Sequence, residues 1–185
     1  GLHKLSKGWV FREWASNATD IYLVGDFNDW QETERYRARR IEGTGNWELR
    51  LSEKAIAHGQ LYKMHVHWNG GSGERIPAWA RRVVQDEQTH IFSAQVWQPE
   101  KTYAWSQKKF KPNTSPLLIY ECHIGMGQDA EKVGTYTEFK ELVLPRIIED
   151  GYNCIQIMAI QEHPYYGSFG YHVSSFFAAS SRFGT

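Results

Sequence analysis

Apolar and polar residues follow two different patterns along the chain, and the change falls near its middle. In the first half, short segments alternate between apolar and polar residues or form brief apolar runs, with turn residues between them. The alternation is clearest over residues 61–68, where Lys63, His65 and His67 share the polar face. About six to eight such strands predict an immunoglobulin-like β-sandwich. The segments expected to form strands include residues 9–14, 21–27, 61–68, 81–85 and 90–97, with a turn at 69–73 and a single helical turn at 53–58.

The second half has the order of a strand, a helix and a second strand. Residues 117–124 and 153–160 are apolar runs, and polar residues close each of them. The length of the connection predicts a right-handed crossover between two parallel strands. Such a unit is typical of the start of a (β/α)8 barrel, although two strands cannot close one. We therefore expect a truncated barrel in this half.

The helix between these strands has recognisable start and stop signals. Thr135 and Glu138 have the spacing of a capping box, and apolar residues follow at helical intervals. Gly151 stands just past the expected end, where glycine is favoured. Pro145 lies inside the helix and should bend it, because proline has no N–H to donate.

Tryptophan marks a boundary between the two halves. All eight tryptophans precede residue 106, and residues 98–116 hold three prolines and several lysines, which is typical of a connection. We predict a β-sandwich domain over residues 1–100, a linker over 101–116, and the first two β/α units of a truncated barrel over 117–185.

The overall charge excludes some classes of partner. The chain has 185 residues, with 21 Lys and Arg balanced by 21 Asp and Glu. This balance gives no basic surface for nucleic acid, and no apolar segment approaches the roughly 20 residues that cross a bilayer. Cys122 and Cys154 fall at opposite ends of the two expected parallel strands. We expect them to be free thiols in a reducing cytoplasm, because thiols so placed are poor partners for a disulfide.

A polar and aromatic loop, residues 161–171, follows the second apolar run. Ligands bind at this end of the strands in α/β proteins. Glu121 and Glu162 could form the carboxylate pair of a glycosidase, which needs about 5–5.5 Å between the groups when it retains configuration. The alternative is that each carboxylate is an ion-pair or hydrogen-bond partner at a strand end.

Three histidines near this loop raise the question of a metal. His123, His163 and His172 could bind zinc together, but their spacing matches no zinc motif. We expect them to contact a ligand through polar atoms or to be core histidines that form hydrogen bonds, and we predict no metal site.

Aromatic residues in both halves suit a carbohydrate ligand, because a ring face can stack on a pyranose while a phenol donates a hydrogen bond. The alternative for the loop aromatics is packing on their own domain. In the first half, Trp30 and Lys63 could form part of a glycan platform, and core packing is the alternative for Trp30. The loop aromatics are Tyr165, Tyr166, Phe169 and Tyr171.

Motifs from both halves resemble one family, the 1,4-α-glucan (glycogen) branching enzymes of the α-amylase superfamily, glycoside hydrolase family 13. The matching segments are, in order, REWASNATDIYLVGDFNDW, IYECHIGM, VGTYTEFKELVLPRI, GYNCIQIMAIQEHPYYGSFGYHV and FFAASSRFGT. The GDFNDW portion also resembles family 48 carbohydrate-binding modules of related enzymes. The resemblance implies such a module over about residues 8–100, followed by the first two strands of a catalytic (β/α)8 barrel, in a cytoplasmic enzyme without a cofactor.

The resemblance also implies an activity for the full-length enzyme. It would cleave an α-1,4-glucan and move the released chain to a 6-hydroxyl through a covalent glycosyl-enzyme. The family's catalytic carboxylates lie at later barrel strands, so it implies no catalytic residue in these 185 residues. An exposed, truncated barrel could associate with itself.

The resemblance extends to individual residues that contact sugar in the family. Tyr171 matches the tyrosine that stacks on the sugar before the cleaved bond, and Gln161, Glu162 and His163 match the loop wall beside it. In the module, Trp30 and Lys63 match glycan-contacting positions. Trp68 aligns with a further one, although the alternation of its strand places it on the apolar, core-facing side.

Two other interpretations stay open. The chain could be a stand-alone α-glucan-binding module with an attached strand–helix–strand unit, or part of a related debranching or trehalose-forming hydrolase. The sequence motif AIQEHPYYGSFGY favours a branching enzyme over the hydrolases.

Overall fold

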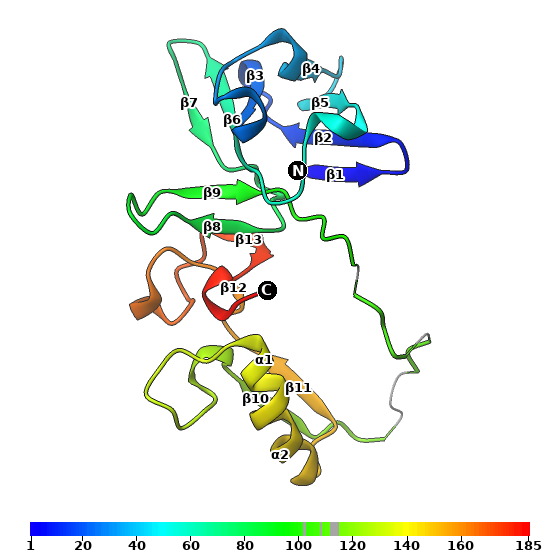
Figure 1. Ribbon diagram of the computed structural model, residues 1–185, viewed down its shortest axis with the longest axis vertical. Coiled ribbons are helices and arrows are strands. Elements are labelled where there is room, and N and C mark those ends of the chain that lie inside the picture. The colour runs from blue at the N-terminus through cyan, green and yellow to red at the C-terminus, as the bar shows by residue number, and fades with distance from the viewer. Residues whose placement is uncertain (102, 108, 112–114) are drawn as a thin grey trace. The chain divides into compact units, whose positions relative to one another are not determined.

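The computed structural model describes residues 1–101, 103–107, 109–111 and 115–185 (Figure 1). The chain divides into two compact units, residues 1–100 with 175–178 and residues 101–174 with 179–185. Each unit has a hydrophobic core of its own. Part of the predicted linker, residues 102, 108 and 112–114, lies outside the described residues. The predicted domain limits stay predictions.

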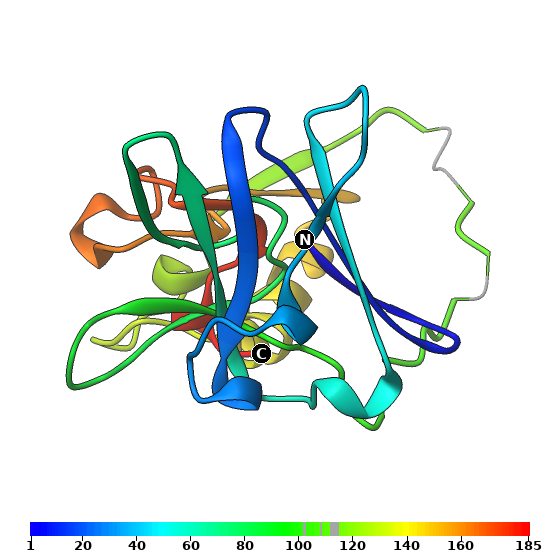
Figure 2. The same ribbon diagram turned by 90° about the horizontal axis from the view of Figure 1, so that it is seen from above.

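The first unit is a sandwich of two antiparallel sheets, whose main strands lie on opposite sides of the unit in the view from above (Figure 2). The first sheet has the order β1 (Leu2–Leu5), β2 (Gly8–Trp14), β5 (Asn46–Leu51) and β4 (Arg39–Arg40). The second has the order β3 (Ala18–Gly25), β6 (Leu61–Trp68), β9 (Phe92–Gln95) and β8 (Val83–Gln85), and β7 (Gly71–Arg75) also pairs with β6. Short 3-10 turns lie at Asp26–Asn28, Glu34–Tyr36 and Glu53–Ala55.

The core of this unit lies where the inward faces of the two sheets meet. Phe11 comes from β2, and Ile21 and Leu23 come from β3; all three are completely buried. Tyr62 and Met64, two positions apart on β6, join the same cluster because alternate residues of a strand face the same side. Burial of each large apolar side chain stabilises the fold by about 1.5–3 kcal/mol.

Most of the predicted strands are confirmed, and β6 covers residues 61–68 as expected. The strands expected over 9–14, 21–27, 81–85 and 90–97 are present with shifted ends. The turn expected at 69–73 is shorter than predicted, because β6 supplies backbone partners that draw Gly71–Arg75 into a strand despite its glycines. The helical turn expected at 53–58 is one of three 3-10 turns in this unit.

The second unit contains the predicted parallel strand pair. β10 (Ile119–Cys122) and β11 (Cys154–Ile157) run parallel, with Ile119 opposite Cys154 and Cys122 opposite Ile157. This unit also contains β12 (Gln161–Glu162) and 3-10 turns at Ile124–Met126, Tyr166–Ser168 and Ser181–Phe183. Most of β13 (Ser175–Ala179) belongs to the residues of the first unit.

The helix between these strands begins with the predicted capping box. Thr135 Oγ1 accepts from the Glu138 backbone N–H at 3.1 Å, and Glu138 Oε2 accepts from the Thr135 N–H at 3.0 Å. Lys132 forms an ion pair with the same carboxylate. The Lys132 ammonium and the Thr135 N–H hold the pKa of Glu138 at about 2, because both favour the charged form.

The helix continues in three parts: α1 (Tyr136–Glu138), a π-helical segment (Phe139–Val143) and α2 (Leu144–Glu149). A π-helical segment lies just before Pro145, where the Leu144 N–H donates to the Phe139 carbonyl five residues back. The bend expected at Pro145 stays a prediction. Gly151 follows the helix with φ 87°, a left-handed conformation that glycine adopts at little cost.

The two cysteines lie at opposite ends of the paired strands, as predicted, and both are free thiols. Burial raises the pKa of Cys122, which lowers the reactivity of this thiol. Among the described residues, no helix has the length and apolar character needed to cross a membrane.

The capping box gives a first prediction. Thr135→Ala should destabilise the helix by about 1 kcal/mol, because the Glu138 N–H loses its acceptor. The measurement is amide hydrogen exchange over residues 136–143, which should become faster. Thr137→Ala makes the same change at an exposed position two residues further on and is the matched control. Equal effects of the two substitutions would contradict the assignment of Thr135 as the N-cap of this helix.

Acid should act on the same contact. The folded-state pKa of Glu138 lies below its ordinary value of 4.5, so its contribution is complete above that value and is lost as the pH falls toward 2. Exchange over residues 136–143, corrected for the intrinsic effect of pH, should therefore lose protection in this window, and less so in Thr135→Ala.

Candidate functional site

The loop after β3 carries Trp30, and its own polar side chains fix it. Asn28 Nδ2 donates to the Gln31 carbonyl at 2.7 Å. Asp26 Oδ1 accepts from Trp30 Nε1 at 3.0 Å, and Asp26 Oδ2 accepts from the Leu61 N–H at 2.7 Å. A single carboxylate therefore ties the indole to the first residue of β6.

Lys63 lies next to this indole. Its ammonium is 5.9 Å from the centroid of the Trp30 ring and forms an ion pair with Glu74 at 2.7 Å. The lysine side chain is only 14% exposed, so the ring and the glutamate hold its ammonium in place. An aromatic face beside a held N–H donor is a combination that suits a sugar, which offers C–H groups and hydroxyls side by side.

Trp68 is not a core residue, contrary to the expectation from strand alternation. It lies at the end of β6 and is 36% exposed. Its neighbours across the sheet are Ala18 on β3 and Gly71 on β7, and residues this small cannot cover an indole. The Arg75 guanidinium lies 5.4 Å from the ring centroid instead. Trp68 is thus a partly exposed tryptophan at the end of β6.

In the second unit, Glu162 is a completely buried carboxylate. Its oxygens accept from the Ser181 N–H at 2.7 Å and the His163 N–H at 3.1 Å, and a longer contact of 3.4 Å joins it to Ser180 Oγ. A buried polar group is tolerated when hydrogen bonds satisfy it. The carboxylate therefore holds the start of the loop against residues 180–181.

His163 is completely buried as well, and Gln161 is half-buried. The His163 ring contacts the Gln161 carbonyl through Nδ1 at 3.1 Å, and the His163 carbonyl accepts from Arg182 Nε at 3.4 Å. The contact with Arg182, like those of Glu162, joins the loop to the segment that follows β13. The three residues predicted to line the loop wall therefore lie at its base.

Tyr171 is placed differently, at the exposed end of the loop. Its side chain is 67% exposed, and its hydroxyl donates to Met158 Sδ at 3.3 Å. Gly170 before it has φ 86° and packs against the Ala159 carbonyl, where a Cβ would clash at 2.5 Å. The loop thus presents an aromatic face to solvent from a constrained backbone. Tyr165 is exposed too, whereas Tyr166 packs against the core of the unit.

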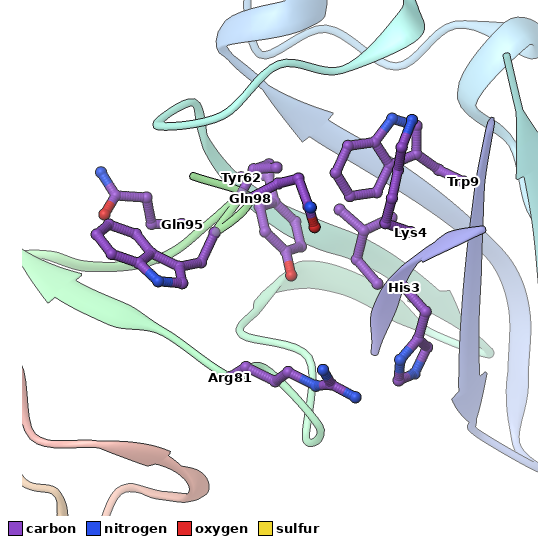
Figure 3. A pocket seen from close by; sticks show the side chains of 10 residues that line it. His3, Lys4, Trp9, Tyr62, Arg81, Gln95 and Gln98 are labelled. Atoms are coloured by element: carbon purple, nitrogen blue, oxygen red, sulfur yellow. The ribbon is translucent and has the colours of Figure 1, made fainter. Parts of the chain in front are cut away.

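A pocket of about 160 Å³ in the first unit was not expected from the sequence. Its lining includes His3, Lys4, Trp9, Tyr62 and Arg81, and Figure 3 shows the Tyr62 hydroxyl directed toward the side where Arg81 lies. Burial raises the pKa of Tyr62 well above its usual range, so the phenol stays protonated. This pocket was not predicted from the sequence because β1, which supplies His3 and Lys4, was not recognised as a strand.

A cluster of potential metal ligands was missed as well. Glu32, His65 and His67 direct one donor atom each toward a common point. This cluster is not the group of three histidines that the sequence analysis considered as zinc ligands. Among the described residues, the donor groups that converge do not include His123, His163 or His172. The alternation along β6 places the two histidines on one face, but nothing in the sequence brings Glu32 to them.

Comparison with known proteins first defines the class of the sandwich. Residues 1–80 match the family described as carbohydrate-binding module 48 (isoamylase N-terminal domain). The first unit, a sandwich of two antiparallel sheets, is therefore similar to the modules of this family over residues 1–80. Crystal structures with the same fold include type I pullulanase from Bacillus subtilis in complex with maltose. That chain has a TM-score of 0.77 at 19% identity, and the match covers 99% of this chain and 28% of the pullulanase.

The sequence relatives are more specific. The chain is 43% identical to the 1,4-alpha-glucan-branching enzyme of Dictyostelium discoideum and 40% identical to that of Saccharomyces cerevisiae. Both alignments cover 100% of this chain and 28% of the relative. The chain is thus homologous over its whole length to the N-terminal region of the glucan-branching enzymes. It spans little more than a quarter of the length of these relatives.

The buried carboxylate gives a second prediction. Glu162→Ala should destabilise the loop by roughly 1–3 kcal/mol, because it leaves buried N–H groups of His163 and Ser181 without an acceptor. Glu162→Gln keeps an acceptor oxygen and should cost less. The measurement is the rate of proteolytic cleavage within residues 161–183. Glu131→Ala, at an exposed position, is the control; a rate unchanged from wild type in Glu162→Ala would contradict a supporting role.

Proposed function

We propose that this chain is the glucan-binding N-terminal part of an enzyme that transfers α-1,4-glucan chains to 6-hydroxyls, forming the α-1,6 branches of glycogen. The observation that carries the proposal is the 43% identity to a branching enzyme over the whole chain. Because the chain spans 28% of that relative, the transfer itself belongs to the longer protein. The reaction would be a retaining double displacement through a covalent glycosyl-enzyme.

In this proposal, β10 and β11 are the first two strands of a catalytic (β/α)8 barrel. Their parallel pairing and the capped helix between them support it. The catalytic carboxylates would come from later strands. Glu162 does not serve as acid or nucleophile, since it is buried and its oxygens are occupied by hydrogen bonds.

Tyr171 is the proposed sugar contact of the second unit. Its exposed ring can stack on a glucose unit, and its hydroxyl is held by a weak acceptor that a sugar hydroxyl could replace. We assign Glu162 and His163 the role of positioning the loop rather than touching glucan, because both are completely buried. Gln161, half-buried at the loop start, belongs to the same support.

Trp30, Lys63 and Trp68 are the proposed glucan contacts of the module. All three belong to the sheet of β3 and β6 or to the loop that follows β3, and each aromatic ring has a cation beside it. The cation of each pair can donate to sugar hydroxyls while the ring face stacks. Trp30 and Lys63 lie together, whereas Trp68 projects from the opposite face of β6, so we propose that glucan contacts the module at two separate positions.

Two further proposals concern the context of the chain. Leu117, Leu118, Leu142 and Ile148 are exposed in the second unit, so this unit could self-associate through apolar surface. The two free thiols favour a reducing compartment, and we propose the cytoplasm.

The alternative interpretations receive less support. A stand-alone module does not account for identity that extends through the second unit to Thr185. The pullulanase structures share the fold, but identities of 17–19% carry no further functional argument for a debranching enzyme.

The glucan platform gives a third prediction. The chain should be retarded in a native gel that contains glycogen, and Trp30→Ala should weaken binding about fivefold or more, equivalent to roughly 1 kcal/mol of lost stacking. Trp14→Ala is the matched control, because Trp14 is an exposed tryptophan of the other sheet of the module. Unchanged mobility of the wild-type chain on adding glycogen would exclude a glucan-binding platform.

Catalysis gives a fourth prediction. These 185 residues alone should not branch amylose, whereas the full-length protein should do so, seen as a shift of the iodine spectrum. In the full-length protein, Tyr171→Ala should lower kcat/KM by about tenfold or more, corresponding to about 1.4 kcal/mol of lost contact. Tyr165→Ala, at another exposed tyrosine of the loop, is the comparison. Branching by the isolated chain would overturn the assignment of the carboxylates to later strands.

A further inference from the structure

Three donor atoms converge on the outward face of β6. Glu32 Oε1 lies 2.7 Å from His65 Nδ1 and 2.7 Å from His67 Nε2. The two imidazole rings stack with their centroids 4.9 Å apart and their planes 24° apart. One carboxylate oxygen therefore faces two ring nitrogens at once, from a different part of the chain.

The protein holds these side chains on a firm support. His65 and His67 lie on β6, which pairs with β3 on one side and β7 on the other along this stretch. The Tyr22 ring packs edge-on against His67, with 5.9 Å between the ring centroids. Glu32 directly follows Gln31, whose carbonyl accepts from Asn28 Nδ2. The three donors are thus positioned before any ligand arrives.

We propose that Glu32, His65 and His67 bind one divalent transition-metal ion of the zinc class. Two imidazoles and one carboxylate form a ligand set that zinc accepts, at about 2.0–2.2 Å from each donor atom. A tetrahedral ion at these lengths would hold the donors roughly 3.3 Å apart. The present separations of 2.7 Å would widen by about 0.6 Å, which a carboxylate in a surface loop can provide.

The exposure of the three side chains suits a bound cation. The three side chains are each about one third exposed, at 32% for Glu32, 29% for His65 and 33% for His67. Solvent can therefore reach the site and supply the remaining ligand.

The nearby cations already have acidic partners. Lys63 pairs with Glu74, and Arg37 pairs with Asp20 and Glu34. Their charges are therefore compensated and oppose a bound cation less.

The site is independent of the proposed glucan platform, although the two are neighbours in sequence. Glu32 follows Trp30 by two residues, and His65 follows Lys63 by two on the same face of β6. A bound ion would tie the loop that carries Trp30 to the strand that carries Lys63. Metal binding itself does not require that the platform binds glucan, so the two proposals can fail separately.

Isothermal titration of the tag-free chain with zinc chloride tests the proposal. We expect saturable binding of one ion per chain at this cluster, and no comparable binding of Mg²⁺ or Ca²⁺, since these prefer oxygen ligands. Cobalt(II) as a second probe should give visible absorption bands of a coordinated ion. A wild-type chain that binds no zinc, or binds magnesium as tightly, would overturn the proposal.

Substitutions locate the ion. His65→Ala, His67→Ala and Glu32→Gln should each weaken zinc binding at least about tenfold, which is the lower end of the cost of losing even an outer-shell partner. His172→Ala, an exposed histidine of the second unit, is the matched control and should bind as the wild type does. Zinc should raise the Tm of the wild type and of His172→Ala, but not of the other three. Wild-type affinity in both His65→Ala and His67→Ala would also overturn the proposal.

Discussion

Alternation along β6 is the constraint on which the first unit depends. Because successive side chains point to opposite faces, the strand that buries Tyr62 and Met64 must present Lys63, His65 and His67 outward. The core therefore fixes the chemistry of the surface. A shift of one residue in register would bury three polar side chains and expose the core, so the position of Lys63 beside Trp30 is as secure as the core itself.

Buried polar groups hold the loop of the second unit in place beside its apolar core. The loop is attached by Glu162, whose oxygens accept from two backbone N–H groups, and by His163, which lies in the same buried layer. Such contacts are directional, so they fix a backbone path that apolar contacts alone would leave adjustable. The exposed ring of Tyr171 gains a defined position from buried groups that need not touch a ligand.

The sequence predicts those features whose signal is local. The capping box at Thr135, the parallel strands and the full extent of β6 follow from spacing and periodicity, and the structure has them. Features that depend on distant partners could not be predicted. Trp68 is exposed because its cross-strand neighbours are Ala18 and Gly71, and register cannot be read from one strand. The contact of Glu32 with His65 and His67 also joins distant parts of the chain, so it could not be predicted from the pattern of β6.

Trp30 and Tyr171, two of the proposed glucan contacts, differ in how they are prepared for a ligand. Trp30 is held by a hydrogen bond from its indole and by the ammonium of Lys63, so little freedom is lost when a sugar stacks on it. Tyr171 follows a constrained glycine, and its hydroxyl makes a weak contact with Met158. A platform that retains a polymer benefits from a preformed surface. A subsite beside the cleaved bond instead needs a ring that can follow a sugar as its conformation changes during the reaction.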